Sequence, residues 1–579
     1  MPPSIIIKKS AIFLLPVFFI FSSIIPSVRA QEPPGSEPGA QTERFQTEAE
    51  KEKARLEKKE LKKPQIEIEE EKEKPAAGPA FVLKEVNVTG SSVFKPEDFR
   101  SAYEHYIDKE VTFEDLQAIV EKIKEKYKKK GYLTTVVYIP EQDIVDGKVE
   151  IRISEGKAGD TKVEGNKWFS TNLLEKSIHI KKNELLNIFT LQRDLIRLNQ
   201  NPDLQVKTVI SAGKEPGTSD ITLKVKERFP YHIGVKFDNQ GTRLTGKERI
   251  SFSLRSTNMA GLGDSLFLNG LITSLTSGAF ASYQLPVDTY GTKLGIDLAY
   301  FGMKIGKEYK GNDITGKSLI CTPKILKEFY LSEDFQLTGD VGIEMKSIKK
   351  WAAGRETADD QLRTPYAGAE LTKVDALFGG GQTTFSPKAS FGTSSFLGAS
   401  SRNHPSANRP GTGGFFFKYE HNLNRIQKMP ILDSYLSIRS QFQSASHTLS
   451  SSEQLQLGGA NSVRGYPEGD YLADIGGTLN VDWVFPMFFL PKELKLPRSQ
   501  TPLRQQVEFV IFADLGGGKL KKVGSDEKSS KFLAGVGGGI RFHVARNLFI
   551  KLDWAEAVGD RPAGGGGPSS FNVAVQFEI

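Results

Sequence analysis

The sequence predicts a transmembrane β-barrel of about 16 antiparallel strands, preceded by two small α+β domains. Two patterns support this prediction. Apolar and polar residues alternate from Tyr231 to the end of the chain, often in runs of nine or more residues. Before them, residues 81–228 show the order strand, helix, helix, strand, strand twice in succession, which indicates two similar modules in tandem.

The first 30 residues have the pattern of a secretory signal peptide. Lys8 and Lys9 precede an apolar run over residues 11–25, and small residues lead to an expected cleavage after Ala30. This run is shorter than the about 20 residues of a membrane-spanning helix, and no later apolar stretch is long enough to form one. We therefore expect a protein that leaves the cytoplasm without an inner-membrane anchor.

Cysteine content and charge argue against a disulfide framework and against nucleic-acid binding. The single cysteine, Cys321, has no partner for a disulfide within the chain, so an exported protein of 579 residues must be held together by other interactions. The formal net charge of +7 is small for this length and gives no reason to expect nucleic-acid binding.

Residues 31–80 lie between the signal peptide and the first module, and their composition changes twice. Segments 31–41 and 64–79 are rich in proline, glycine or charge, as linkers are. Between them, residues 42–63 are strong helix formers with charges of both signs. A helix that is polar on every face has no core to pack against, so this segment is either a solvated tether or a helix that rests in a water-filled channel and plugs it.

The two modules span residues 81–156 and 157–228. In the first, residues 113–130 form a helix that Thr112 caps and Gly131 ends. One face of this helix is apolar, with Phe113, Leu116, Ile119, Val120, Ile123 and Tyr127. Each module has a strand edge, and an exposed edge can pair with an extended peptide. The modules are therefore either peptide-binding units or structural spacers.

The strands in residues 229–579 fit a membrane barrel better than a soluble sandwich. The last strand, for example, places Phe571, Val573, Val575 and Phe577 on one face. Strands of soluble proteins are about five or six residues long, whereas strands that cross an outer membrane need about nine or more. At about 22 residues for each strand and its connection, this segment holds about 16 strands.

Counting strands back from the C-terminus assigns the two sides of the membrane. The connection at residues 545–547 is short, as periplasmic turns are, whereas the connections at 516–530 and 558–570 are long, as extracellular loops are. By this alternation, residues 446–475 belong to an extracellular loop. The connection at 486–504 is long for a periplasmic turn, and its role stays open.

Three motifs occur in an informative order. Residues 138–166 (YIPEQDIVDGKVEIRISEGKAGDTKVEGN) are followed by VRGY at 463–466 and by FADLG at 512–516. In this order they resemble the two-partner secretion transporter family, which includes the ShlB/FhaC/HecB-like haemolysin secretion and activation proteins. The first motif resembles that family's junction between two POTRA domains, the second its inward-folded sixth loop, and the third its barrel wall.

The resemblance implies an outer-membrane pore with two periplasmic POTRA domains, at residues 81–156 and 157–228, that exports a large secreted partner such as an adhesin or haemolysin. A role in activating that partner is also open. The expected partners are the unfolded client, outer-membrane lipid and the barrel-assembly machinery, with no nucleic acid, no cofactor and a monomeric state. The motif residues expected to join loop and wall are Val463, Arg464, Gly465, Tyr466, Phe512, Asp514 and Gly516.

Two other functions remain as alternatives. A barrel-assembly insertase shares the VRGY motif and the POTRA unit, but that resemblance would imply more than the two units found in residues 81–228. A plain porin or ligand receptor needs no POTRA units at all.

Residues 311–318 (GNDITGKS) match the phosphate-binding loop pattern, but their surroundings do not support nucleotide binding. That chemistry requires a buried strand before the motif and a helix after it, whereas Pro323 follows in a region of alternating residues. The seven histidines show no ligand spacing, and no nucleophile or paired-carboxylate arrangement stands out. We expect neither enzyme activity nor a metal site.

Alternation along residues 506–515 predicts a partner for the loop arginine. Phe512 and Asp514 share one face, so Asp514 points into the lumen if the other face meets lipid. That other face is apolar, with Val507, Phe509, Ile511 and Ala513. A guanidinium matches a carboxylate in two parallel hydrogen bonds. We therefore predict that Arg464 folds back to pair with Asp514, with Gly465 permitting the turn and Tyr466 packing on the wall.

Overall fold

The computed structural model describes residues 34–57, 64–68, 80–491, 493–495, 502–524, 527–544, 547–563 and 567–579. The predicted signal peptide lies outside these residues, as do residues 58–63 of the predicted charged helix. No helix within the described ranges is both long enough and apolar enough to cross a membrane.

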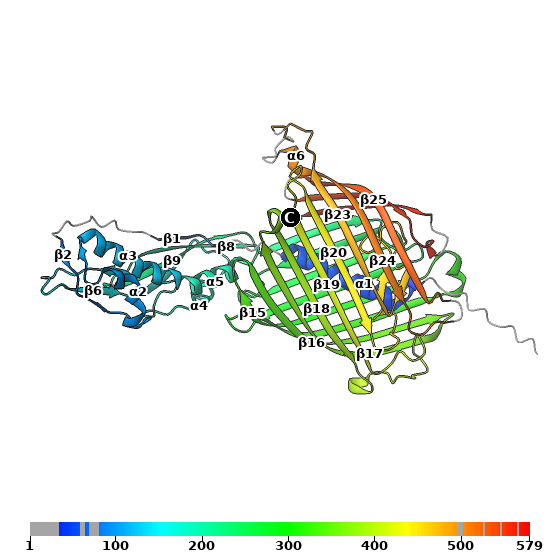
Figure 1. The fold of residues 1–579 in the computed structure, drawn as a ribbon. Helices are drawn as coiled ribbons and strands as arrows, with labels where there is room; N and C mark the ends of the chain where they lie inside the picture. The colour runs from blue at the N-terminus through cyan, green and yellow to red at the C-terminus, as the bar shows by residue number, and fades with distance from the viewer. Residues whose placement is uncertain are drawn as a thin grey trace, which may run out of the picture. The chain divides into compact units, whose positions relative to one another are not determined.

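Sixteen antiparallel strands form a closed barrel, which confirms the predicted fold class (Figure 1). The first and last strands close it where residues 234–238 pair with residues 574–578. The strands are β10 (Tyr231–Asp238), β11 (Arg249–Ser256), β12 (Ser265–Ile272), β13 (Thr276–Pro286), β14 (Thr292–Lys304), β15 (Thr315–Leu331), β16 (Phe335–Ala352), β17 (Arg355–Asp375), β18 (Gly381–Gly392), β19 (Phe416–Lys428), β20 (Tyr435–Ala445), β23 (Ile475–Pro486), β24 (Val507–Lys519), β25 (Ser530–Val544), β26 (Leu548–Ala557) and β27 (Ser569–Glu578). Short helices in the connections are η4 (Lys307–Asn312), η5 (Leu377–Gly379), η6 (Phe396–Gly398) and α6 (Leu503–Gln506).

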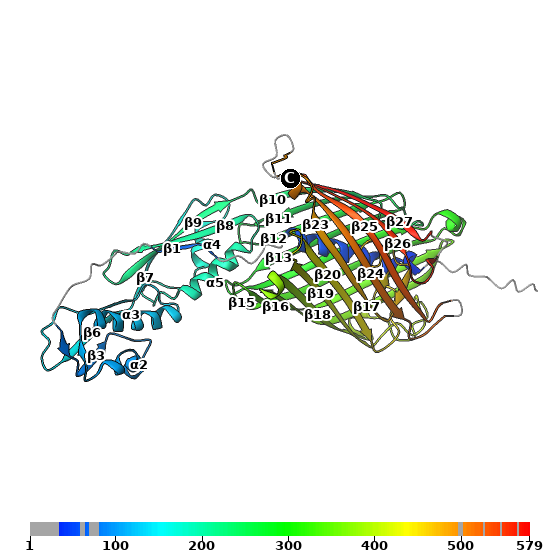
Figure 2. The same cartoon turned by 45° about the horizontal axis from the view of Figure 1, so that its top comes forward.

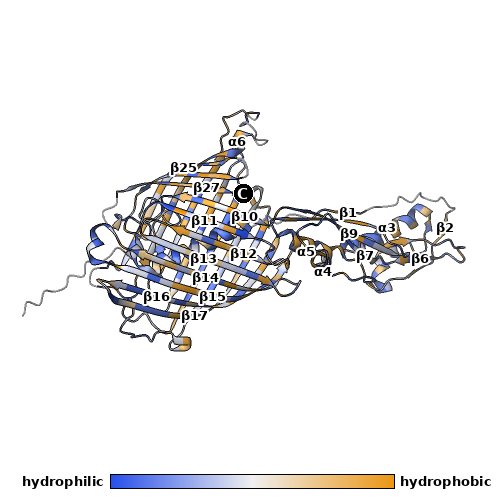
Figure 3. Cartoon of the chain, turned by 180° about the vertical axis from the view of Figure 1, so that it is seen from behind, coloured by the Kyte–Doolittle hydropathy of each residue, from blue (hydrophilic) through white to orange (hydrophobic). Residues whose placement is uncertain are grey.

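The two faces of the barrel wall differ in burial, as a barrel surrounded by lipid requires. Along β14, the apolar residues Ile296 and Leu298 are exposed, whereas Asp297 between them is buried on the inner face. Figure 3 shows hydrophobic and hydrophilic residues alternating along the strands. The outward face is therefore the apolar one.

Val507 departs from this pattern. The alternation predicts that it faces lipid with Ile511 and Ala513, and those two residues are exposed, but Val507 itself is buried. It is the first residue of β24 and follows α6 directly, so the short helix covers the position that lipid would otherwise occupy. Phe509 is partly buried, in ring contacts with Phe485 and Phe489.

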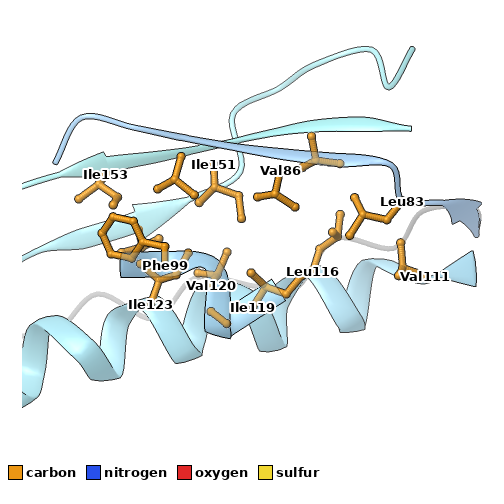
Figure 4. Packing of buried hydrophobic residues seen from close by; sticks show 14 of the residues in the cluster. Leu83, Val86, Phe99, Val111, Leu116, Ile119, Val120, Ile123, Ile151 and Ile153 are labelled. Carbon is orange, nitrogen blue, oxygen red and sulfur yellow. The ribbon is translucent and has the colours of Figure 1, made fainter. Parts of the chain in front are cut away.

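The first small domain packs a helix on a three-stranded sheet. The sheet has the order β3 (Glu85–Thr89), β6 (Lys148–Ser154) and β5 (Val136–Tyr138). Helix α3 (Phe113–Lys129) buries its apolar face against this sheet (Figure 4). Residues 81–89 form two strands rather than the one strand with which the predicted element order begins, because Leu83 turns into the core between them. The remaining elements are β2 (Phe81–Val82), η2 (Pro96–Phe99), α2 (Arg100–Tyr103), η3 (Glu104–Tyr106) and β4 (Glu110–Val111), which pairs with β2.

The second small domain repeats the same element order. Its elements are β7 (Lys157–Glu164), α4 (Thr171–Lys176), α5 (Ile188–Asn199), β8 (Leu204–Ala212) and β9 (Thr218–Glu227). A further strand, β1 (Ile66–Ile68), comes from the segment expected to be a linker and pairs in parallel with β8. An edge strand offers unpaired backbone groups, and Ile66 packs on the apolar core of the domain. Both contacts stabilise this short strand.

Helix α1 (Pro38–Glu57) differs from the predicted helix in two ways. It begins at Pro38 rather than at Thr42, directly after η1 (Pro34–Ser36), because proline is tolerated in the first turn of a helix. It is also not polar on every face, since Phe45 and Ala49 are buried against inward-facing apolar residues of β12, β13 and β14. The helix thus lies on the inner surface of the wall, and Figures 1 and 2 both draw it among the barrel strands.

Candidate functional site: the inward loop and its barrel partners

The connection between β20 and β23 turns into the barrel. It contains a two-stranded sheet of β21 (Leu455–Leu457) and β22 (Tyr471–Ala473). Apolar side chains of this sheet pack with the loop tip and with β25, in a cluster of Leu455, Leu457, Val463, Tyr466, Tyr471, Ala473 and Leu533. This packing brings the tip, residues 463–466, against the inner face of the wall.

Arg464 at the loop tip is only 1% exposed and lies against Asp514. Its Nε and Nη2 atoms donate to the two carboxylate oxygens of Asp514 at 2.6 and 2.7 Å, and its backbone N–H donates to the same carboxylate at 3.0 Å. Asn480 donates a fourth hydrogen bond to Asp514 at 2.8 Å. The pair therefore has the two-pronged geometry in which guanidinium and carboxylate bind most strongly.

Two further aspartates, which the sequence motifs do not include, surround the same guanidinium. Arg464 Nη2 donates to Asp482 at 2.5 Å, and Nη1 lies 3.8 Å from an oxygen of Asp553. The ring centroid of Phe512 lies 3.4 Å from the guanidinium carbon. Alternation along β23 and β26 could have placed both aspartates on inward faces, but it could not have shown that they meet this arginine.

Two glycines allow the loop tip to approach the wall. Gly465 has a φ of 98°, and a Cβ on it would lie 2.7 Å from the backbone nitrogen of Ala557. Gly516 faces Val463, and a Cβ on it would lie 2.6 Å from Val463 Cγ2. A residue with a side chain at either position would push the loop away from the wall.

Tyr466 completes the contact between loop tip and wall. Its hydroxyl accepts hydrogen bonds from the backbone N–H groups of Gly559 at 3.0 Å and Ala534 at 3.4 Å, and its ring is buried. The structure thus brings all seven motif residues to one place on the inner wall: Val463, Arg464, Gly465, Tyr466, Phe512, Asp514 and Gly516.

Helix α1 and the inward loop share a partner on the wall. Lys346 of β16 pairs with Glu43 of α1 at 2.9 Å and with Glu453 of the loop at 2.8 Å. The side chain of Gln456 in the loop also donates to the carbonyl of Ala40 in α1 at 2.6 Å. A movement of the helix away from the wall therefore breaks its contacts with the loop.

Further contacts hold α1 to other strands. Glu48 pairs with Arg249 of β11 at 2.8 Å, and Lys53 donates to Ser282 of β13 at 2.8 Å. The rings of Phe45 and Phe301 lie 5.8 Å apart. The cavity that remains between this face of the helix and the wall is only about 60 Å³.

A larger cavity of about 500 Å³ lies at the end of α1 that adjoins the second small domain. It is lined by residues of the helix, of that domain and of the barrel, including Glu57, Leu173, Leu198, Gln284 and Thr338. Within the described part of the chain, no group of three or more His, Cys, Asp and Glu side chains could hold a metal ion.

A closed barrel with an inward loop fixed to its wall and small α+β domains ahead of it is the architecture of the POTRA-barrel class of outer-membrane proteins. The family model of the haemolysin secretion/activation proteins ShlB/FhaC/HecB matches residues 217–542, and the ShlB-type POTRA model matches residues 81–156. Since the first match covers more than half of the chain, the protein belongs to this family.

Individual relatives agree with this assignment. The heme/hemopexin transporter protein HuxB of Haemophilus influenzae (strain 86-028NP) is 24% identical over 470 residues, which are 78% of this chain and 79% of that protein. The outer membrane transporter CdiB of Dickeya dadantii (strain 3937) is 24% identical over 488 residues, 80% of each. The solved structure of CdiB from Escherichia coli superposes with a TM-score of 0.70 at 19% identity and covers 96% of this chain and 100% of that chain.

Membership of this family places the protein in the outer membrane with its POTRA region in the periplasm. The protein is a two-partner secretion transporter that exports a large secreted partner protein.

Proposed function

We propose that α1 seals the pore of the resting transporter and leaves it when a client crosses. The observation that carries this proposal is the set of contacts that α1 makes around the lumen, with Arg249 of β11, Phe301 of β14 and Lys346 of β16. Buried ion pairs add little net stability, because the cost of desolvation offsets their attraction. The ion pairs of α1 therefore oppose its departure only weakly, and the strand pairing of the wall does not depend on the helix.

Deletion of residues 34–57 tests this proposal. Single-channel conductance in planar bilayers should rise, while secretion of the client should persist. Arg55→Gln is a control, since Arg55 donates its hydrogen bonds to Glu52 of its own helix, and it should leave the conductance unchanged. If the deletion variant and the intact chain have equal conductance, α1 does not seal the pore and is a tether.

The client crosses the lumen unfolded and folds on the outside. Folding beyond the membrane removes the unfolded form from the equilibrium and so gives transport its direction without a nucleotide. The protein acts as a monomeric pore, without enzyme activity or a cofactor, after insertion by the barrel-assembly machinery. The role of Arg464 is to hold the inward loop, through Asp514, in the conduction path.

The client is captured on strand edges of residues 81–228. An extended segment can add to an edge through main-chain hydrogen bonds, and β3 and β5 are the edges of the first sheet. In the second sheet β1 covers the β8 edge. A fragment of residues 81–228, which lacks β1, should bind the N-terminal domain of the client saturably. Absence of binding at high micromolar concentration would count against capture at these edges.

The client is a large adhesin or haemolysin. The matched family carries haemolysin secretion in its description, whereas the HuxB relative is described as a heme/hemopexin transporter, so the relatives do not fix a single cargo. A gene for a large secreted protein adjacent to this one, whose product is lost from the medium when this transporter is deleted, would identify the client.

A further inference from the structure

Three lysines lie on neighbouring strands at one edge of the barrel wall. Lys304 ends β14, Lys317 lies near the start of β15, and Lys349 lies near the end of β16. These strand ends are on the side of the inward-loop connection, residues 446–475, and opposite the end at which β10 follows the second small domain. The three lysines therefore lie at the extracellular edge of the wall.

The side chains of these lysines point away from the lumen. On β15, Ser318 contacts α1 inside the barrel, so its neighbour Lys317 faces outward. On β16, Lys346 contacts α1, and Lys349, three residues further, faces outward for the same reason. Lys304 belongs to the exposed face of β14. All three cations thus meet the membrane rather than the channel.

The strand register brings these charges close together. Lys317 lies directly opposite Lys349 on one side and opposite Gly302 on the other, and Lys304 follows Gly302 by two residues on the same face. Like charges directly opposite each other on neighbouring strands destabilise a sheet. An anion bound beside Lys317 would reduce this repulsion.

Acidic side chains compensate only one of these cations. Lys349 pairs with Glu356 at 3.3 Å and with Asp359 at 3.2 Å. Among the residues that the structure describes, Lys304 and Lys317 form no ion pair within 4 Å. Two ammonium groups are thus left to bind a ligand from outside the chain.

The space beside Lys317 suits a phosphate group above a lipid chain. Gly302 has no side chain, and the nearest atoms to a Cβ placed on it would be the hydroxyls of Tyr300 and Ser277, at 3.7 and 3.8 Å. These hydroxyls are hydrogen-bond donors at the same place as the ammonium groups. On the membrane side, Tyr300 and Leu319 are exposed, as aromatic and apolar residues are where an outer-membrane barrel meets its lipid.

We propose that Lys304 and Lys317 bind the phosphate of an anionic glycolipid in the outer leaflet, beside Lys349, which Glu356 and Asp359 already neutralise. The phosphate lies between the lysines and near the hydroxyls of Tyr300 and Ser277, and the acyl chains cover the apolar wall below. Basic clusters at a membrane surface recognise lipid headgroups in this way. An inorganic phosphate would meet the same charges, but it would leave the apolar surface below them uncovered.

The full-length protein, purified in a non-ionic detergent, should bind bis-phosphorylated lipid A in a titration followed by native mass spectrometry. Each lysine near an anionic lipid changes affinity by about fivefold, so Lys304→Ala with Lys317→Ala should weaken binding by about 25-fold. The matched control is Lys307→Ala with Lys310→Ala. It removes the same charge from η4, in the connection between the same two strands, and should bind lipid A as the unaltered protein does.

Equal weakening in the two double variants would overturn the proposal, because total charge would then account for the binding. Equal binding of lipid A without its phosphates would also overturn it, because acyl contacts alone would then suffice. Displacement of the lipid by an equal concentration of inorganic phosphate would overturn it in favour of a free-phosphate site. Retention of the lipid in that competition, together with the about 25-fold difference predicted for the two lysines, would support the lipid site.

Discussion

Replacing Arg464 with alanine should detach the loop tip from the barrel wall and stop most secretion. The side chain supplies two of the four hydrogen bonds that reach Asp514. Without it, Asp482 still pairs with Arg439 and Asp553 still pairs with Arg541, but the buried carboxylate of Asp514 loses its cation. The largest cost therefore falls on Asp514.

The expected magnitude follows from burial. Removing one partner of a buried ion pair costs about 3–5 kcal/mol, and the side chains of Arg464 and Asp514 are 1% and 0% exposed. Water in the lumen should reduce this value. Asp514→Ala should cost less than Arg464→Ala, because the guanidinium keeps its contacts with Asp482 and Asp553. The double variant should be little worse than Arg464→Ala alone.

The assay is the amount of client secreted, measured beside the heat-modifiability that reports a folded, inserted barrel. Arg439→Ala is a matched control, since Arg439 pairs with Asp482 at 2.9 Å and is itself part of the wall rather than of the loop. It should secrete almost normally. Normal secretion by Arg464→Ala, or losses that multiply independently in the double variant, would refute the reasoning.

Three further predictions concern the loop, the helix and the joint between barrel and second domain. Gly465→Ala should reduce secretion as strongly as Arg464→Ala, because a methyl group at φ 98° would meet the backbone of β26; normal secretion would contradict this. Lys346→Met should raise single-channel conductance, since it removes the ion pair that holds Glu43 of α1 to the wall. An unchanged conductance would show that this ion pair does not hold the helix. Asp203 precedes β8 in the second small domain and joins it to the barrel, because its carboxylate accepts a hydrogen bond from Thr257 at 2.8 Å and lies 2.9 Å from His232 of β10. Burial raises the pKa of Asp203, but hydrogen bonds, led by that with His232, hold the pKa below its ordinary value. Because the pKa of Asp203 is lower in the folded protein than in the unfolded chain, its ionised carboxylate stabilises the folded protein above pH about 4. This stabilisation is lost as the pH falls through the folded pKa. Asp203→Asn should therefore increase proteolysis between the second small domain and the barrel at neutral pH. The difference from the unaltered protein should vanish in acid. A difference that does not change with pH would contradict a stabilising role for the Asp203 carboxylate.

The barrel could be predicted from the sequence because alternation reports a physical requirement at every strand. A residue such as Leu298 must meet lipid while its neighbour Asp297 faces the lumen, and this alternation can be recognised without knowledge of tertiary contacts. The strand β1 could not be predicted, because three residues, Ile66–Ile68, carry too little pattern to distinguish a strand from a linker. Its formation depends on the edge of β8, which lies in a distant part of the chain.

The candidate site was only partly predictable for a similar reason. Alternation places Asp514 on the inner wall, and its neighbour Phe512 with it. The contributions of Asp482 and Asp553 depend on the relative positions of three strands and a folded loop, which residue spacing does not encode. The apolar side of α1 rests on Phe45 and Ala49 within 20 residues, too few to give a helical stripe that periodicity can detect.

Whether α1 occupies the lumen at rest and must leave it for transport can be tested with one reversible crosslink. The side-chain oxygens of Thr42 in α1 and Ser318 in β15 are hydrogen-bonded to each other, so cysteines at these two positions should form a disulfide. In a Cys321→Ser background, the oxidised Thr42→Cys, Ser318→Cys variant should not secrete its client, and reduction should restore secretion. Thr42→Cys alone should secrete normally under both conditions. Full secretion with the crosslink intact would contradict the account.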